Sequence, residues 1–139
     1  MTFEEKGTWL YGAVSIALPV FYFATILGQV ATTPVGDIEY QALLIGVIVA
    51  AIVITIIGMI GIGISSPSDA GKADIRDKEI DRFGSYVGGT VTLVAMLVPL
   101  GLAMVAAAQF WIANAIYLGF VVGSLTSTAT KLIAYRRGL

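Results

Sequence analysis

The chain has 139 residues, of which 58% are hydrophobic and 12% are charged, and its formal net charge at pH 7 is −1. Soluble domains carry about 25% charged residues, so this composition indicates a membrane protein with the lipid bilayer as its main partner. The absence of Cys and His excludes disulfides, thiol nucleophiles, His-ligated haem and Cys/His zinc sites. The small net charge does not indicate a direct nucleic-acid partner.

Four apolar stretches are long enough to cross a bilayer core of about 30 Å as helices, which takes roughly 20 residues each. They cover residues 8–30, 42–64, 86–107 and 110–130, and none contains Asp, Glu, Lys or Arg. Their hydrophobicity is continuous rather than alternating, which is typical of spanning helices. The sequence thus predicts an all-α protein with a single domain, residues 1–139, built as a transmembrane four-helix bundle.

The chain begins with the residues MTFEEKGTW, which carry two Glu and one Lys and lead into the first predicted span. A signal peptide has a basic head and a shorter apolar run, so we expect this span to be retained. Pro19 in the first span and Pro99 in the third interrupt the hydrogen-bond pattern of a helix. We expect both prolines to kink their helices.

The basic residues all fall on one side of the predicted membrane. Lys6 precedes the first span, four basic residues lie in the connection 65–85, and three follow the fourth span. These seven are Lys72, Arg76, Lys78, Arg82, Lys131, Arg136 and Arg137. The positive-inside rule then places the N-terminus, the connection 65–85 and the C-terminus in the cytoplasm.

Four glycines are candidates for helix packing. Gly84 and Gly88 form one GxxxG spacing, and Gly119 and Gly123 form another. Small residues at this spacing let helix backbones approach closely in lipid. The approach takes place either within one chain or between the two copies of a homodimer.

The fourth span carries a polar stripe with a spacing of three and four residues, which places its members on one helix face. The stripe consists of Asn114, Tyr117, Val121, Ser124, Thr128, Lys131 and Tyr135, and the candidate polar-path residues in it are Asn114, Tyr117, Ser124, Thr128 and Lys131. The first span has a similar stripe of Gly12, Ser15, Pro19, Tyr22 and Gln29. Two such stripes facing inward predict hydrogen bonds between helices. The alternative interpretation is a polar path for a small solute.

The connection 65–85 is the only long polar segment. Pro67 and Gly71 end the second span, and from Ala73 onward the residues favour a helix up to Gly84. A charged cluster in this helix is the candidate partner-binding surface, and it consists of Asp74, Arg76, Asp77, Asp81 and Arg82. Alternatives are a cation site formed by the three Asp, or a solvated helix that extends the third span.

Three segments resemble an uncharacterised family of small four-span bacterial membrane proteins, chiefly actinobacterial. The first is a D-x-R-D-x-x-I core, here Asp74 to Ile80; the others are Trp-Ile-Ala-Asn at 111–114 and Tyr-Arg-Arg-Gly at 135–138. The resemblance covers the second half of the chain and implies four spans in the bacterial plasma membrane. Such proteins often accompany helix-turn-helix regulators, so it also implies a regulatory role.

We therefore expect a non-enzymatic, multi-pass membrane protein that acts as a regulatory or partner-binding subunit through its charged loop. No catalytic, cofactor or metal residues are assigned, and a cytoplasmic protein is the expected partner. The alternative is a small dimeric transporter or channel with a polar path along the first and fourth spans. Multidrug exporters of this size carry a Glu inside their first span, and this chain has none there.

Overall fold

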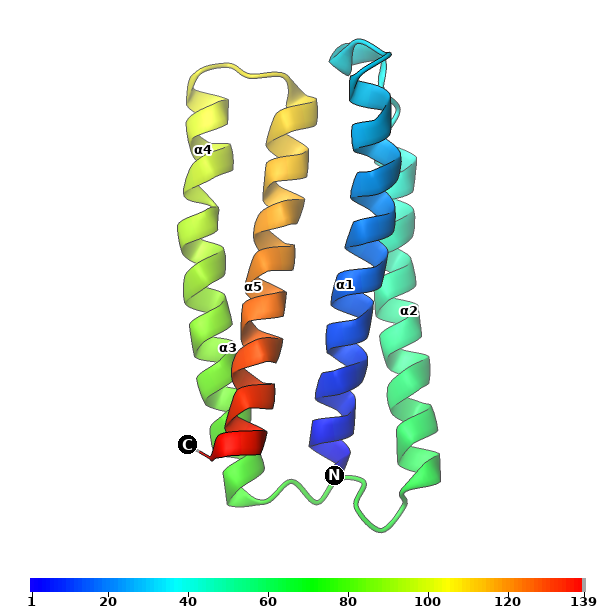
Figure 1. Ribbon diagram of the computed structural model, residues 1–139, viewed down its shortest axis with the longest axis vertical. Helices are drawn as coiled ribbons and strands as arrows, with labels where there is room; N and C mark the ends of the chain where they lie inside the picture. Colours follow the sequence, from blue (N-terminus) through cyan, green and yellow to red (C-terminus); the bar gives the residue numbers. More distant parts are fainter. Residues whose placement is uncertain (139) are drawn as a thin grey trace.

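The computed structural model describes residues 1–138 and is all-α. Its elements are α1 (Phe3–Val30), the short 3-10 helix η1 (Val35–Asp37), α2 (Gln41–Ser65), α3 (Ile75–Ala95), α4 (Leu97–Met104) and α5 (Gln109–Arg137) (Figure 1). Four helical units are long and apolar enough to cross a membrane: α1, α2, α3 with α4, and α5. The prediction of an all-α chain with four such helices is confirmed.

α1, α5 and the unit of α3 with α4 are longer than the predicted spans because polar residues extend them at one end. The Thr2 side chain accepts a hydrogen bond from the Glu5 backbone N–H, which starts α1 at Phe3. Asp74 caps α3 in the same way, so that helix begins at Ile75, well before the predicted span. Side chains that accept from the first free N–H groups of a helix stabilise its start.

The two prolines affect their helices differently. α1 continues through Pro19 to Val30, whereas the third apolar unit is interrupted between α3 and α4 at Met96. Pro99 has no N–H for a hydrogen bond to the carbonyl four residues earlier, at Ala95, and its ring crowds that carbonyl. α3 ends at this residue, Ala95.

The helices pack in a row in the order α2, α1, α5, and α3 with α4 (Figure 1). α1 and α5 form the middle of the row, and α2 and α3 make at most minor contact with each other. The predicted four-helix bundle is therefore open along one side. The reason is that the glycine-containing face of α3 packs on α5, and the connection of residues 66–74 is long enough to join separated helices.

Both termini and the α2–α3 connection lie at one end of the molecule (Figure 1). We call it the basic end because all eight Lys and Arg residues are found in these segments or in the adjoining helix ends. The opposite end contains η1 and the α4–α5 connection.

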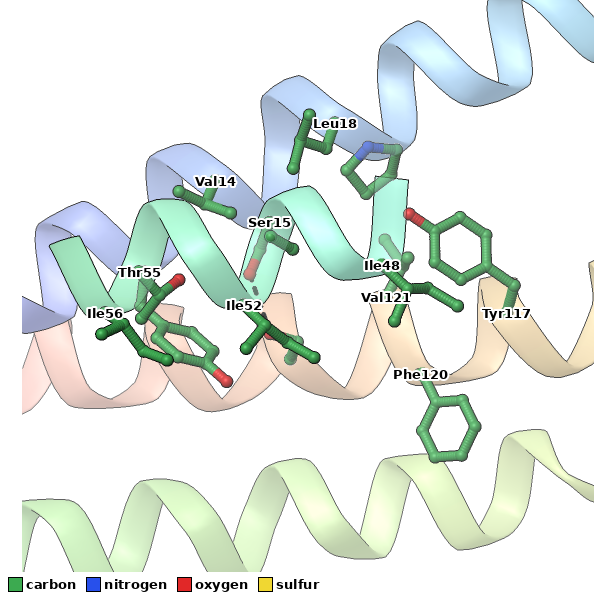
Figure 2. A pocket seen from close by; sticks show the side chains of 14 residues that line it. Val14, Ser15, Leu18, Ile48, Ile52, Thr55, Ile56, Tyr117, Phe120 and Val121 are labelled. Atoms are coloured by element: carbon green, nitrogen blue, oxygen red, sulfur yellow. Dashed lines mark hydrogen bonds between the residues drawn. The ribbon is translucent and has the colours of Figure 1, made fainter. Parts of the chain in front are cut away.

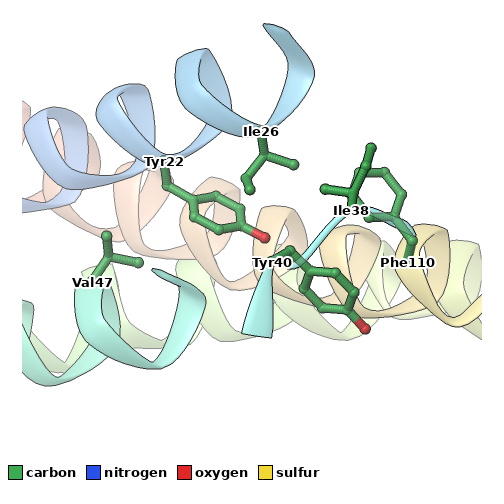
Figure 3. Close-up of a cluster of buried hydrophobic side chains, with 6 residues drawn as sticks. All are labelled: Tyr22, Ile26, Ile38, Tyr40, Val47 and Phe110. Carbon is green, nitrogen blue, oxygen red and sulfur yellow. The ribbon is translucent and has the colours of Figure 1, made fainter. Parts of the chain in front are cut away.

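The buried hydrophobic cluster lies toward the opposite end and joins three helices (Figure 3). It consists of Tyr22, Ile26, Ile38, Tyr40, Val47 and Phe110. Tyr40 and Phe110 meet edge to face with ring centroids 5.4 Å apart, a favourable aromatic arrangement. The α1–α2 connection is thereby fixed against the start of α5. α2 has a single buried residue, Val47, so most of its apolar surface is exposed.

Candidate functional site

The two polar stripes meet at the interface between α1 and α5. The hydroxyls of Ser15 and Ser124 share a hydrogen bond of 2.9 Å. A Cβ on Gly12 would lie 2.8 Å from Cγ2 of Thr128, so a larger residue than glycine would push these helices apart. The two stripes face each other, as predicted, and polar groups on them join the two helices.

The four glycines lie together at the interface between α3 and α5, within one chain. All four are buried. A Cβ on Gly88 would lie 2.6 Å from the carbonyl oxygen of Gly123, so the two backbones are in direct contact. Gly119 lies against Met96 and Gly123 lies against Thr92. A side chain at Gly88 or Gly123 would meet the backbone of the other helix, and one at Gly119 would meet the Met96 side chain. The absence of side chains at these positions allows the close packing of α5 on α3.

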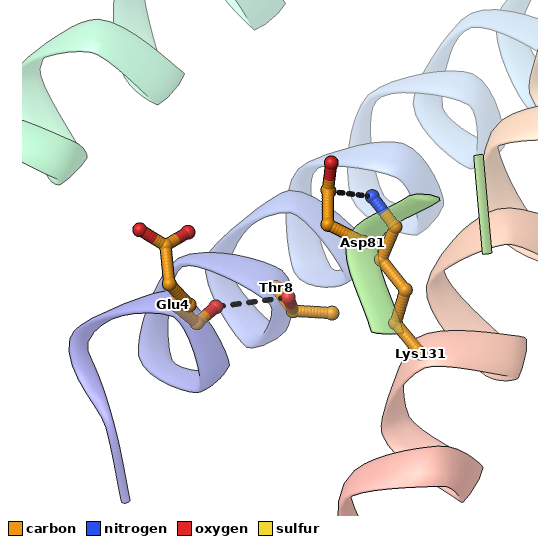
Figure 4. Close-up of polar contacts among 4 residues, drawn as sticks. All are labelled: Glu4, Thr8, Asp81 and Lys131. Carbon is orange, nitrogen blue, oxygen red and sulfur yellow. Dashed lines mark hydrogen bonds and ion pairs between the residues drawn. The ribbon is translucent and has the colours of Figure 1, made fainter. Parts of the chain in front are cut away.

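Gly84 makes room for the only ion pair among the described residues. The aliphatic stem of Lys131 crosses directly over Gly84, and its ammonium group lies 2.6 Å from Oδ1 of Asp81 (Figure 4). The Lys131 side chain is 18% exposed and that of Asp81 is 68% exposed. The Asp81 carboxylate therefore faces outward from a partly buried ammonium group.

Asp74 and Asp77 form a capping box at the start of α3. Asp74 Oδ1 accepts a hydrogen bond of 2.8 Å from the Asp77 backbone N–H, and the Asp77 carboxylate accepts from the Asp74 N–H in return. Asp77 is only 5% exposed, and Thr2 also donates to it. These two carboxylates therefore stabilise the chain itself, and that of Asp77 is not available at the surface.

Further contacts tie the α2–α3 connection to both ends of the chain. Arg76 donates to the carbonyl oxygen of Tyr135, and Lys6 donates a hydrogen bond of 2.6 Å to the Ser66 hydroxyl. The guanidinium of Arg136 lies 5.7 Å from the ring centre of Trp9, within cation–π range. Lys6 of α1 thus holds the start of the connection, Arg76 ties the start of α3 to α5, and Arg136 ties α5 to α1.

An open groove runs along the side of the row where α2 and α3 do not meet. Its apolar part has a volume of about 410 Å³ and lies between α1, α2 and α5 (Figure 2). Leu18, Ile48, Ile52 and Phe120 are among its lining residues. Ser15 and Ser124, whose hydroxyls share a hydrogen bond, both line this part.

The polar part of the groove lies toward the basic end and has a volume of about 520 Å³. Its lining comes from α1, α2, α3 and α5 and includes Glu4, Thr55, Asp81, Ser85, Gly89, Thr128 and Lys131. Tyr11, Thr55 and Ser124 line both parts, so the two parts adjoin at these residues. We call the two parts together the lateral groove.

The predicted polar-path residues are divided between the groove and the interior. Tyr117, Ser124, Thr128 and Lys131 line the lateral groove. Asn114 does not line it and instead accepts a hydrogen bond from Tyr22 inside the molecule. Among residues 1–138, no group of three or more His, Cys, Asp or Glu residues has the geometry to hold a metal ion. The three Asp of the connection are therefore not gathered into a cation site.

The charged-loop residues also differ in their positions. Asp74, Asp77 and Asp81 are used in the cap and the ion pair, whereas Arg82 is exposed on the surface. Ile75, which is 78% exposed at the start of α3, was not among the predicted site residues. Nor were the groove residues Tyr11, Thr55 and Ser85, because only the packing order of the helices brings them together. The exposure of Ile75 was predictable, because helical spacing places this residue on the face opposite Asp77 and Ile80.

Comparisons of the chain with models of known protein families, with curated proteins and with solved structures find no match.

Proposed function

We propose that this chain is a non-enzymatic, multi-pass protein of the bacterial plasma membrane that acts as a regulatory or partner-binding subunit. Both termini and the α2–α3 connection lie in the cytoplasm in this proposal. The location of all eight basic residues at one end supports that orientation through the positive-inside rule.

The observation that carries the proposal is the exposed face of the first turns of α3. Ile75, Lys78, Glu79 and Arg82 are exposed and recur at three and four residues, so they share one face. The opposite face, which includes Asp77 and Ile80, is buried against the rest of the chain. An apolar side chain as exposed as Ile75, flanked by charges of both signs, is a suitable anchor for a protein partner.

The contacts at the basic end make this face rigid. The capping box at Asp74 and Asp77 fixes the helix start, and the bond from Arg76 to Tyr135 fastens it to α5. A surface that is ordered before binding loses less conformational entropy on association. The charged residues around Ile75 would set the specificity and the association rate, with a dependence on salt.

The test is capture of a cytoplasmic partner by the tagged full-length chain, with Ile75→Ser and Arg82→Glu combined in one variant. The matched control is Asp69→Lys, a charge reversal on an exposed turn of the same connection. We expect a protein that the parent and the control capture at low salt and the double variant does not. Equal capture by all three chains would contradict the proposed surface.

A transporter or channel is the second candidate because Tyr117, Ser124, Thr128 and Lys131 line the lateral groove. The strongly polar lining lies in the half of the groove nearer the basic end, so a path across the membrane would need further polar groups from a second copy. Ion flux through the purified chain in liposomes tests this candidate. Flux that Ser124→Leu abolishes would favour it over the partner-binding subunit.

A further inference from the structure

We propose that the lateral groove binds one phospholipid with a zwitterionic ethanolamine headgroup, taken from the membrane leaflet at the basic end. This inference goes beyond the proposed function, since Ile75 and its face lie outside the groove. The inference is based on the length, the polarity and the charge of the groove.

The length of the groove matches one leaflet. On α5 the groove extends from Lys131 to Tyr117, and at 1.5 Å per residue these fourteen positions cover about 21 Å. A bilayer measures about 40–45 Å with its headgroup regions, so one leaflet takes up about half of that. Lys131 is about 33 Å from Gln109 along α5, which places its ammonium group at headgroup level.

The polarity of the groove changes along its length as that of a phospholipid does. The charged residues Glu4, Asp81 and Lys131 line the end at headgroup level. The hydroxyls of Tyr11, Thr55 and Ser124 follow at the junction of the two parts, at the depth where ester groups would lie. Beyond them Leu18, Ile52 and Phe120 provide an apolar surface for an acyl chain (Figure 2).

The charges favour a zwitterionic headgroup. Lys131 has three N–H donors, and one of them points at Asp81, so donors are left for a phosphate oxygen. The Asp81 carboxylate is largely exposed (Figure 4) and has a second oxygen to accept from an ammonium group. The charged residues that line the polar part are two acidic ones, Glu4 and Asp81, and one basic one, Lys131. An anionic headgroup without an ammonium group would therefore meet net repulsion.

The groove is also accessible from the side. α2 and α3 flank it without packing on each other. Gly89 lines its polar part, and a Cβ there would meet no atom within 4 Å. A lipid can therefore enter laterally from the leaflet without separating two packed helices. Polar groups facing lipid are costly, and a bound headgroup and its ester groups would lower that cost.

The first test measures lipid adducts on the delipidated chain by native mass spectrometry, with dioleoyl phosphatidylethanolamine and dioleoyl phosphatidylglycerol as probes. We expect the ethanolamine lipid to bind about fivefold more tightly. Gly89→Phe should weaken its binding by about tenfold or more, because the ring fills the groove. Gly101→Phe is the control, since Gly101 is exposed on α4 with nothing within 4 Å. Equal affinity for the two lipids, or equal binding by both variants, would overturn the inference.

The headgroup selection is tested by Glu4→Gln combined with Asp81→Asn, which removes both carboxylates and keeps Lys131. We expect the preference for the ethanolamine lipid to disappear in this variant while total lipid binding persists. An unchanged preference would show that these carboxylates do not read the headgroup and would overturn the charge assignment.

A second measurement uses the unmodified chain and does not depend on the folding of a variant. A phosphatidylethanolamine with a photoreactive group at the end of one acyl chain is added to vesicles, and the labelled positions are mapped. Label concentrated at Ile48, Ile52 and Phe120 supports the site. Label spread evenly over the outer faces of α2 and α4 overturns it, as does cross-linking of the groove to a second copy. Neither result would affect partner capture through Ile75.

Discussion

The Tyr22 hydroxyl donates a 2.7 Å hydrogen bond to Oδ1 of Asn114, and this bond joins α1 to α5 inside the molecule. Tyr22 is fully buried and Asn114 is 8% exposed. The Asn114 amide also donates to the carbonyl oxygen of Phe110, one turn earlier on α5. Both groups of the Asn114 side chain are thus satisfied, which is the condition for burying an amide among apolar side chains.

Replacing Tyr22 by Phe removes this bond and keeps the ring. We expect the free energy of unfolding to fall by about 0.6–1.7 kcal/mol, from the average to the largest value measured for hydrogen bonds between membrane helices. Equilibrium unfolding in bicelles would measure the change. Tyr11→Phe is the matched control because Tyr11 is 53% exposed and lies on the same helix. Equal effects of the two substitutions would mean that the Tyr22–Asn114 bond does not stabilise the α1–α5 interface.

The contact between α3 and α5 is testable with two neighbouring glycines. Gly88→Ala puts a Cβ against the backbone of Gly123, whereas Gly89→Ala puts it into open space. We expect Gly88→Ala to lower the unfolding free energy by about 1–3 kcal/mol through overpacking. Gly89→Ala should be neutral or slightly stabilising, because alanine is the better helix former. Thermal unfolding in detergent would compare the two. A Gly88→Ala chain as stable as Gly89→Ala would contradict the close packing.

The four helices were predictable because a bilayer requires long apolar runs, and these runs are unambiguous in the sequence. The facing of Ser15 and Ser124 was also predictable, since residues at helical spacing share a face. On two otherwise apolar helices, polar side chains have few hydrogen-bond partners other than each other. The packing order of the helices was not predictable, and with it the lateral groove, because similar apolar faces fit several arrangements.

The roles of the acidic residues in the charged connection were less predictable from the sequence. Asp74 and Asp77 are spaced three apart, as in a capping box, but the box usually has Ser or Thr first and Glu or Gln last. The same pair of carboxylates is equally suited to a partner's basic residues. Only the burial of Asp77 distinguishes the structural role from the docking role.

The orientation of the chain is tested by single cysteines, because the sequence has none of its own. Thr33 lies near η1 at the opposite end, and Ala73 lies in the connection at the basic end. In intact cells we expect a membrane-impermeant maleimide to label Thr33→Cys and not Ala73→Cys, with both labelled after lysis. Labelling of Ala73→Cys alone in intact cells would show that the orientation is the reverse of the one proposed. Labelling of both would contradict a single topology.

The last prediction separates the two roles of the acidic residues in the connection. Asp74→Ala removes the acceptor for the Asp77 N–H, and the loss of an N-cap costs about 0.5–2 kcal/mol. Glu79→Ala, on the exposed face of the same helix, should change the unfolding free energy by about 0.5 kcal/mol at most. Thermal unfolding of both variants would measure the difference.

Partner capture should show the reverse order. If α3 binds a partner through the face that contains Ile75 and Glu79, Glu79→Ala weakens capture at low salt. Asp74→Ala should weaken it only as far as the helix start unfolds. Lowering the temperature should therefore restore capture by Asp74→Ala and leave that by Glu79→Ala weak. Permanent loss of capture in a folded Asp74→Ala chain would assign the Asp74 carboxylate to the partner interface in addition to the cap.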